Sequence, residues 1–370
     1  MNIYEQIGLK KVINACGKMT PLGVSAVKNE VAESMSQALQ DYVEIDELIQ
    51  YTGKVISKHT NTENACPTIG AAAGIAISVA ATISKTNLHI IEQLPFFDGA
   101  ANEIIIQKGH VVHFGASIKQ MISLGGGRAI EVGFANRTYR EHIEQAITNK
   151  TVALFYVKSH HTVQKGMQSL EVMIDIAKKH NLPLIVDAAA EEDLKKYSKL
   201  GANLIIYSGG KALNGPTSGF ICGDQVWIEA CRMQYKGIGR AMKVSKESMV
   251  GLIMALDNYV AKDSNLEKQK ERMEILCNRL SEIPGVTTGI EQDEAGRPIY
   301  RTRIQLNALE TGITASELSE TLRKGSPAIY LRDHYSNLGL LHIDPRPLLE
   351  GQEDIIVDRI IEIIGGQRAQ

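Results

Sequence analysis

Short, almost wholly apolar runs alternate with helix-length segments through the middle of the chain, from about residue 103 to residue 227. The segments between the runs, such as Leu170–His180, carry apolar side chains at helical spacing. This alternation is typical of βαβ units in an α/β fold, and strands that are apolar throughout predict helices over both faces of a parallel sheet. The predicted strands are Glu103–Gln107, Ala129–Gly133, Val152–Val157, Pro183–Asp187, Asn203–Ser208 and Gly219–Cys222.

Two other parts of the chain flank this core. Residues 1–55 form an N-terminal segment, and residues 56–245 are expected to fold as the large, cofactor-binding domain. Residues 246–370 are expected to form a linking helix and a small α+β C-terminal domain. The helical stretch extends from Ser245 to Leu280, and a charged turn at 291–298 separates two of the later strands.

Composition narrows the possible partners. The chain has 370 residues, 44% of them hydrophobic, and its formal net charge of -2 offers no basic excess for nucleic-acid phosphates. No apolar run approaches the roughly 18 to 20 residues of a membrane span, and the N-terminus lacks the apolar core of a signal peptide. We therefore expect a cytoplasmic protein with neither nucleic acid nor membrane as a partner. Five cysteines without a C-x-x-C pair predict buried thiols rather than disulfides or zinc ligands.

The most informative stretch is Leu204–Gly219, where an apolar strand runs into glycines, a lysine and further turn residues. Ligand sites of open α/β sheets lie at such strand ends. Lys211 can form a Schiff base there, because burial and nearby charge readily tune a lysine amine. Ser208, close by in sequence, can offer its hydroxyl to a phosphate. A surface lysine in a Gly-rich loop is the alternative interpretation, which the neighbouring motifs disfavour.

Asp187 ends the buried strand that comes before this one. One helix and one strand separate it from Lys211, so both residues are expected among the same layer of strand ends. A carboxylate in this place can keep the pyridine nitrogen of pyridoxal 5'-phosphate (PLP) protonated, which lets the ring act as an electron sink. The alternative role for an aspartate at a strand end is a helix cap.

A small-residue turn at 66–74 opens an Ala-rich helix. Unpaired amides at a helix N-terminus bind phosphate, and small residues allow close approach. We expect the amides of Ile69 and Gly70, with Thr68 beside them, to bind the PLP phosphate. A tightly packed buried helix is the alternative. The turn lacks the spacing of a nucleotide-binding P-loop.

Further cofactor contacts are expected from residues that follow other predicted strands. His113 or Phe114, in the stretch after residue 107, can stack on the pyridine ring, and Ser159 can bind its phenolic oxygen. Metal ligation is the rival role for the histidines of these stretches. No carboxylate completes a site of regular spacing, so we expect no metal.

Together these motifs resemble the fold-type I PLP enzymes, and within them the selenocysteine synthase-like group, L-seryl-tRNA selenium transferase and its shorter relatives. The resemblance implies a seven-stranded type of mostly parallel sheet, PLP as the cofactor, and a homodimer or a higher even-numbered homo-oligomer. The segments that carry it are 12–17, 64–74, 131–138, 186–187, 208–216, 239–246 and 343–346.

Among the shorter relatives the chain looks like the ammonia-lyases that act on D-glucosaminate 6-phosphate, notably in residues 1–5, 13–20 and 215–219. This implies a lyase of carbohydrate metabolism that dehydrates and deaminates a small phosphorylated amino-sugar acid to 2-keto-3-deoxy-6-phosphogluconate and ammonia. The resemblance makes Lys211 the base for the Cα proton and Asp187 the second catalytic residue. It also makes Arg332 the anchor of the substrate carboxylate, for which a guanidinium fork is suited.

Other activities are open on the sequence alone. One alternative is a selenocysteine synthase-like transferase or a serine-type dehydratase, although the missing basic excess argues against a tRNA substrate. The other is a non-catalytic regulator with the same fold, which would keep the phosphate turn and lose the reactive residues. Ser208, Lys211 and Asp187 are all present, which argues against the regulator.

Overall fold

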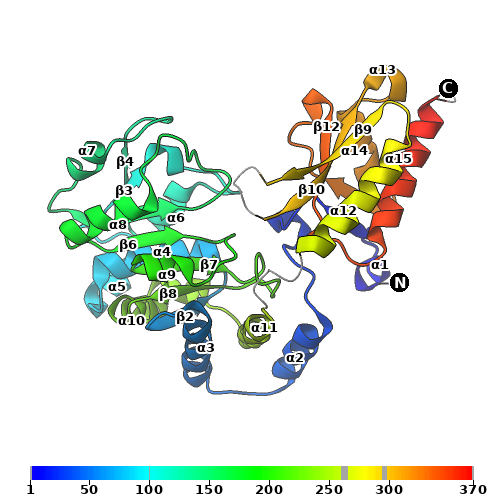
Figure 1. The fold of residues 1–370 in the computed structure, drawn as a ribbon. Coiled ribbons are helices and arrows are strands. Elements are labelled where there is room, and N and C mark those ends of the chain that lie inside the picture. The colour runs from blue at the N-terminus through cyan, green and yellow to red at the C-terminus, as the bar shows by residue number, and fades with distance from the viewer. Residues whose placement is uncertain (1, 100, 260–265, 294–297, 369–370) are drawn as a thin grey trace. The chain divides into compact units, whose positions relative to one another are not determined.

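The computed structural model describes residues 2–99, 101–259, 266–293 and 298–368 (Figure 1). The chain forms two compact units. The large unit comprises residues 26–260, and the small unit combines residues 1–25 with residues 261–370. The sequence pattern placed the boundaries after residues 55 and 245, whereas the packing of the chain divides it after residues 25 and 260.

A seven-stranded sheet runs through the large unit in the order β2-β8-β7-β6-β5-β3-β4. Strands β3 to β7 are parallel, β8 is antiparallel to β7, and β2 is antiparallel to β8. The mostly parallel sheet is therefore confirmed, and no end of a predicted strand is displaced by more than one residue. The strands are β2 (Asn64–Thr68), β3 (Glu103–Gln107), β4 (Arg128–Val132), β5 (Thr151–Val157), β6 (Leu184–Asp187), β7 (Leu204–Ser208) and β8 (Gly219–Gly223).

Side chains along each strand alternate between two apolar cores. On β7, Ile205 and Tyr207 belong to one core, whereas Leu204 and Ile206 belong to the other. Helices cover both faces, as the apolar strands predicted. The first face is covered by α3 (Ile45–Thr60), α7 (Arg140–Glu144), α8 (Leu170–Lys179), α9 (Lys196–Leu200) and α11 (Lys246–Asp257). The second is covered by α4 (Ala71–Ser84), α5 (Leu88–Gln93), α6 (Ile118–Leu124) and α10 (Gln225–Met233).

Two features of the large unit differ from the sequence-based expectation. Strand β2 lies in the stretch that was interpreted as a turn, because asparagine and proline are poor strand formers. Its Pro67 is tolerated at the edge of the sheet, where one side of the strand has no partner strand. The predicted helical stretch from Ser245 to Leu280 contains two helices, since α11 ends at Asp257. Helix α2 (Asn29–Gln40) packs against α11.

The small unit has α+β character, as predicted. A three-stranded antiparallel sheet has the order β12-β10-β9, and β1 pairs in parallel with β11. The charged turn expected at 291–298 contains residues 294–297, which lie outside the described residues. The strands are β1 (Val12–Ala15), β9 (Val286–Gln292), β10 (Tyr300–Leu306), β11 (Ala328–Leu331) and β12 (Leu340–Ile343). The helices are α1 (Ile3–Gln6), α12 (Leu266–Ser281), α13 (Ala308–Thr311), α14 (Ala315–Lys324) and α15 (Gln352–Arg368).

A buried network of arginine–aspartate ion pairs links the strands of the small unit. Arg301 on β10 donates from Nε to Asp344 at 2.9 Å and from Nη2 to Asp293 at 2.8 Å. Arg346 donates to both carboxylate oxygens of Asp344, at 2.9 and 2.7 Å. Burial alone would raise the pKa of Asp344, but the guanidinium groups of Arg346 and Arg301 outweigh burial and hold this pKa far below its usual range.

Replacing Asp344 by Asn should destabilise the small unit, because Arg301 and Arg346 would each lose a charged partner. Removing one member of a buried ion pair costs about 3 to 5 kcal/mol. We expect the free energy of unfolding of this unit to fall by an amount in that range. Hydrogen exchange of peptides from residues 298–368, followed across a urea series, measures it.

The exposed ion pair between Arg279 and Asp354, with N and O 2.5 Å apart, provides the matched control. Asp354→Asn should change the free energy of unfolding by less than about 1 kcal/mol, as is usual for surface pairs. Equal losses in the two variants would refute a special contribution of the buried network.

Candidate active site

The predicted cofactor residues of the large unit come from neighbouring strand ends. Asp187 ends β6 beside Ile206 of β7, and Ser208 ends β7. Ser208 pairs with Gly219, the first residue of β8, and Gly219 pairs on its other side with Thr68 at the end of β2. The sheet register therefore places Ser208, Gly219 and Thr68 in one row across three strands.

Asp187 is buried, with 8% of its surface exposed. Its Oδ1 accepts a hydrogen bond from the backbone amide of Ala189 at 3.1 Å. Burial raises the pKa of this carboxyl group, and the positive charge of Lys211 opposes the rise. The two residues that the sequence paired as catalytic thus interact electrostatically. A carboxylate in such a partly desolvated place is suited to hold a proton on a pyridine nitrogen.

The loop between β7 and β8 carries Lys211, which is half-buried. Backbone hydrogen bonds fold this loop back on itself, from Gly209 to the carbonyl of Ser218 and from Gly215 to the carbonyl of Gly209, each at 2.8 Å. A Cβ atom on Gly209 would overlap the Ser218 hydroxyl. The tight return of the loop therefore leaves no space for a side chain at Gly209 unless Ser218 shifts.

The turn between β2 and α4, where the phosphate is predicted to bind, is approached closely by β8 and is open at the Gly70 α-carbon. A Cβ atom on Gly219 would lie 2.6 Å from the carbonyl carbon of Gly70, so the missing side chain lets β8 approach this turn closely. A Cβ atom on Gly70 would meet no atom within 4 Å. The Thr68 hydroxyl donates to the Gly70 carbonyl at 2.9 Å, and the partly buried Ile69 lies between them. Because α4 starts at Ala71, its first amides have no partner within the helix.

The other predicted cofactor residues lie in loops. His113 is exposed and Phe114 is partly buried against the second core, so the two candidates for stacking differ in their surroundings. Ser159 follows β5, and its hydroxyl accepts a hydrogen bond from the backbone amide of His161 at 3.2 Å. Which ring stacks on the cofactor, and what Ser159 binds, stay predictions.

Sequence reasoning missed His110, which is completely buried. Its Nδ1 accepts the backbone amide of Val157 at 3.3 Å, and its ring lies edge-on against Tyr156 with 4.5 Å between ring centroids. Burial lowers the pKa of His110 to about 4, so the ring is neutral near pH 7. The next amide along the chain, that of Lys158 just after β5, donates to the carbonyl of Asp187 at 2.8 Å. His110 therefore fixes a strand end directly beside Asp187.

Arg332 belongs to the small unit, where its backbone exchanges two hydrogen bonds of 2.9 Å with His342. Its predicted contact with the substrate carboxylate stays a prediction. Within the described residues, no group of three or more His, Cys, Asp or Glu side chains is placed to hold a metal ion. The cysteines are free and buried. The described helices include none with the length and apolarity of a membrane span.

Comparison with known proteins extends these observations. Residues 12–308 match the family model described as L-seryl-tRNA selenium transferase. The chain is 48% identical over 362 residues to D-glucosaminate-6-phosphate ammonia lyase of Salmonella typhimurium, covering 98% of each protein. It is 42% identical to 5'-C-glycyluridine monooxygenase-decarboxylase of a Streptomyces species, covering 98% of this chain and 92% of the relative. A solved structure of D-glucosaminate-6-phosphate ammonia-lyase matches with a TM-score of 0.94 and 47% identity, over 100% of this chain and 99% of that one.

These likenesses confirm the fold-type I class and PLP as the cofactor. The phosphate turn, Asp187 and the Lys211 loop, all within the large unit, fit that cofactor in their burial and charge. The family model extends over most of the sequence, from the first strand of the small unit through the large unit. The chain therefore belongs to the L-seryl-tRNA selenium transferase family.

Proposed function

We propose that this protein is a PLP-dependent ammonia-lyase that converts D-glucosaminate 6-phosphate to 2-keto-3-deoxy-6-phosphogluconate and ammonia. The observation that carries the proposal is the 48% identity, over 98% of both chains, to an enzyme named for that activity. The TM-score of 0.94 to a solved structure of such an enzyme supports it. The substrate is then a small phosphorylated amino-sugar acid.

Lys211 and Asp187 are the catalytic residues of the proposal. PLP, when bound, withdraws electrons from the substrate carbon that loses its proton. The Lys211 amine takes that proton from Cα. The Asp187 carboxylate holds the proton on the pyridine nitrogen, a role that its burial and its interaction with Lys211 support.

The remaining cofactor contacts are assigned by position. The amides of Ile69 and Gly70, together with Thr68, bind the phosphate at the start of α4, and the space around the Gly70 α-carbon supports this. Ser208, whose hydroxyl is also assigned to the phosphate, lies in the same row of the sheet, two strands from Thr68. Stacking on the ring and binding of its phenolic oxygen are assigned to His113 or Phe114 and to Ser159.

Arg332 is the proposed anchor of the substrate carboxylate. A guanidinium group can donate two parallel hydrogen bonds to a carboxylate, which fixes orientation as well as binding it. Arg332 follows β11 in the small unit. Removal of the Arg332 guanidinium group should therefore weaken binding of the substrate before it affects any later step.

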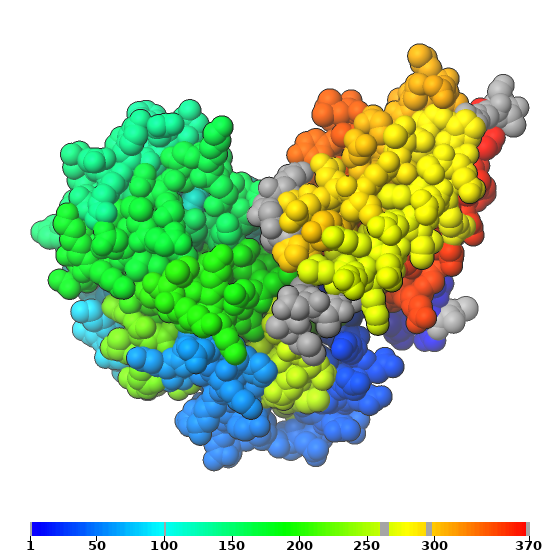
Figure 2. Space-filling view, in the orientation of Figure 1, coloured from blue at the N-terminus to red at the C-terminus, as the bar shows by residue number. Residues whose placement is uncertain are grey.

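The proposal includes a homodimer or a higher even-numbered homo-oligomer in the cytoplasm. In the large unit, several exposed large apolar residues lie close together in sequence, within residues 39–51; this N-terminal part of the chain is drawn in blue in Figure 2. Helix α2, which leads into this segment, buries Val31 and leaves its other side chains at least partly exposed. A gathering of this kind favours a protein interface. Its members are Leu39, Tyr42, Val43, Ile45 and Tyr51.

Transfer of selenium to seryl-tRNA is the second candidate, because the matched family carries that description. The net charge of -2 disfavours it, since a tRNA partner is bound through its phosphates by clustered cations. A serine-type dehydratase and a non-catalytic regulator complete the alternatives. Each predicts a different outcome in the substrate assay below.

Gly70→Ala tests the phosphate turn. The new methyl group meets no protein atom within 4 Å, so the free energy of unfolding of the apoprotein should change by less than about 1 kcal/mol. The methyl group would occupy the space that the phosphate needs, so the Kd for PLP should rise roughly tenfold or more. Titration of the visible absorption measures this Kd, and Gly365→Ala, also in open space, is the control. An unchanged Kd would place the phosphate elsewhere.

Lys211→Ala tests the attachment of the cofactor. The variant should lose the visible absorption of bound PLP and the ability to retain PLP covalently after borohydride reduction, because the attached amine is gone. Spectra and intact mass after reduction measure both properties. Lys199→Ala, an exposed lysine of the same unit, should keep them. Survival of both properties in Lys211→Ala would assign the linkage to another lysine.

The substrate assay compares release of ammonia and keto acid from D-glucosaminate 6-phosphate, D-serine, L-serine and seryl-tRNA. We expect turnover of the sugar acid with a kcat/KM at least a hundredfold above that for either serine. Turnover of serine alone would indicate a dehydratase. Conversion of seryl-tRNA would favour the transferase, and no turnover with PLP bound would favour the regulator.

A further inference from the structure

Residues 188–193 follow Asp187 and begin with a tight turn from Ala188 to Glu191. Backbone hydrogen bonds hold both ends of this turn. Ala188 donates its amide to the carbonyl of Ile206 at 2.9 Å, and the amide of Glu191 returns to the carbonyl of Ala188 at 2.9 Å. Between them, the Ala189 amide binds Asp187 Oδ1. The orientation of the Asp187 carboxylate therefore depends on the shape of the turn from Ala188 to Glu191.

Tyrosine hydroxyls from separate parts of the large unit converge on this segment. Tyr197 of α9 donates to the carboxylate of Glu191 at 2.6 Å. Tyr207 of β7 donates to the carbonyl of Asp193 at 3.2 Å, and Tyr259, after α11, donates to the carbonyl of Glu192. Of these contacts, the one from Tyr197 engages a side chain that can carry charge.

The hydrogen bond between Tyr197 and Glu191 is the strong member of this set. Burial raises the pKa of the Tyr197 phenol and the nearby Glu191 raises it further, so the hydroxyl remains a donor at every physiological pH. A donor that faces a carboxylate forms a charge-assisted bond, which is shorter and stronger than a neutral one. Glu191 is partly buried, and loss of this donor would favour rotation of its carboxylate toward water.

We propose that Tyr197 is a positioning residue of the cofactor site, which holds Glu191 and thereby the turn whose Ala189 amide orients Asp187. The inference rests on the proposed function, since it assigns Tyr197 to the support of the Asp187 contact with the pyridine nitrogen. Tyr197 acts through Glu191 and the backbone. It therefore supports the catalytic pair without being a catalytic residue.

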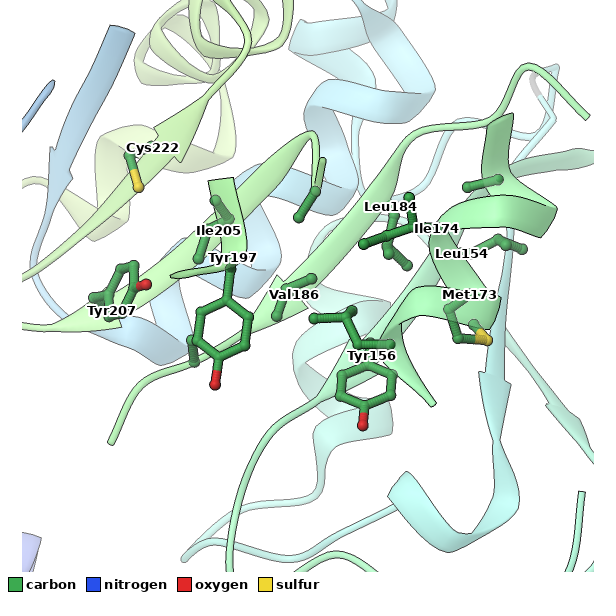
Figure 3. Packing of buried hydrophobic residues seen from close by; sticks show 14 of the residues in the cluster. Leu154, Tyr156, Met173, Ile174, Leu184, Val186, Tyr197, Ile205, Tyr207 and Cys222 are labelled. Carbon is green, nitrogen blue, oxygen red and sulfur yellow. The ribbon is translucent and has the colours of Figure 1, made fainter. Parts of the chain in front are cut away.

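Tyr156 provides a matched control from the same core. Figure 3 shows the rings of Tyr156 and Tyr197 on the same side of the strands, with their hydroxyl groups pointing in a similar direction. Both side chains are buried. Burial and the charges of Glu171 and Glu191 raise the pKa of the Tyr156 phenol, so its hydroxyl shares the electrostatic surroundings of the turn. The tyrosine hydroxyl hydrogen bonds described for residues 188–193 come from Tyr197, Tyr207 and Tyr259, and not from Tyr156. Tyr156→Phe thus removes a hydroxyl from the same environment without releasing the turn.

The test compares Tyr197→Phe with Tyr156→Phe in the full-length holoenzyme. For Tyr197→Phe we expect the Kd for PLP to rise about tenfold, the change that 1.4 kcal/mol produces. The pH midpoint of the visible absorption of bound PLP should move upward. The reason is that a pyridine ring whose nitrogen holds its proton less firmly withdraws fewer electrons from the linkage to Lys211, so the nitrogen of this linkage becomes more basic. The kcat should fall with KM changed less than twofold, and Tyr156→Phe should leave all of these values within about twofold.

Glu191→Ala and Glu191→Gln separate positioning from folding. Glu191→Ala should reproduce the effects of Tyr197→Phe, and the double variant should add little to either, because both remove one interaction. Glu191→Gln keeps an acceptor for the hydroxyl and should restore most of the affinity for PLP. Unchanged Kd and pH midpoint in folded Tyr197→Phe, or equal shifts in Tyr156→Phe, would overturn the inference.

Asp187→Asn distinguishes failure of this inference from failure of the proposed function. If Asp187→Asn shifts the pH midpoint and Tyr197→Phe does not, Tyr197 has no positioning role and the role of Asp187 survives. If Asp187→Asn leaves both the Kd and the pH midpoint unchanged, Asp187 does not contact the pyridine nitrogen. The proposed role and the inference then fail together.

Discussion

Burial of the Asp187 carboxylate at the end of β6 is the constraint on which the proposed site depends. A carboxylate away from water is costly unless other groups compensate for the lost hydration. Here the compensation consists of one backbone amide and the field of Lys211, so the group is left ready for a cationic partner such as a protonated pyridine. The parallel strands β5 and β7 on either side and the turn after Asp187 fix the place of this one charge. Tyrosine hydroxyls bind the residues that follow this turn.

A buried carboxylate in the small unit, that of Asp344, has surroundings that differ from those of Asp187. Asp344 is buried still more completely, yet Arg301 and Arg346 surround it and its pKa is lowered rather than raised. That carboxylate is satisfied by its own unit and needs no ligand. The two pKa values shift in opposite directions because Asp344 has two guanidinium partners, whereas Asp187 has one backbone amide and the charge of Lys211 to offset its burial. A buried carboxyl group with a perturbed pKa is a candidate for a functional group.

The central strands of the large sheet, β3, β5, β6, β7 and β8, were predictable because each is buried on both faces and almost wholly apolar. For the same reason Asp187 and Lys211 were identified together, since both follow such strands. Strand β2 was missed because its proline and asparagine oppose strand formation and pairing with β8 decides its conformation. His110 was missed because Val157, 47 residues along the chain, becomes its neighbour only through packing of the sheet. Tyr197 and Glu191 are six residues apart, but no local sequence pattern marks the hydrogen bond between them.

The close approach of β8 to the turn after β2 limits which substitutions a protein of this family can accept. Gly219 joins the row that carries Ser208 and Thr68, and it leaves no space for a side chain against Gly70. Gly219 therefore joins the turn after β2 to the loop between β7 and β8 that carries Lys211. Relatives whose names describe ammonia elimination, oxidative decarboxylation and selenium transfer can share this arrangement, provided that variation is confined to the surfaces that meet the substrate.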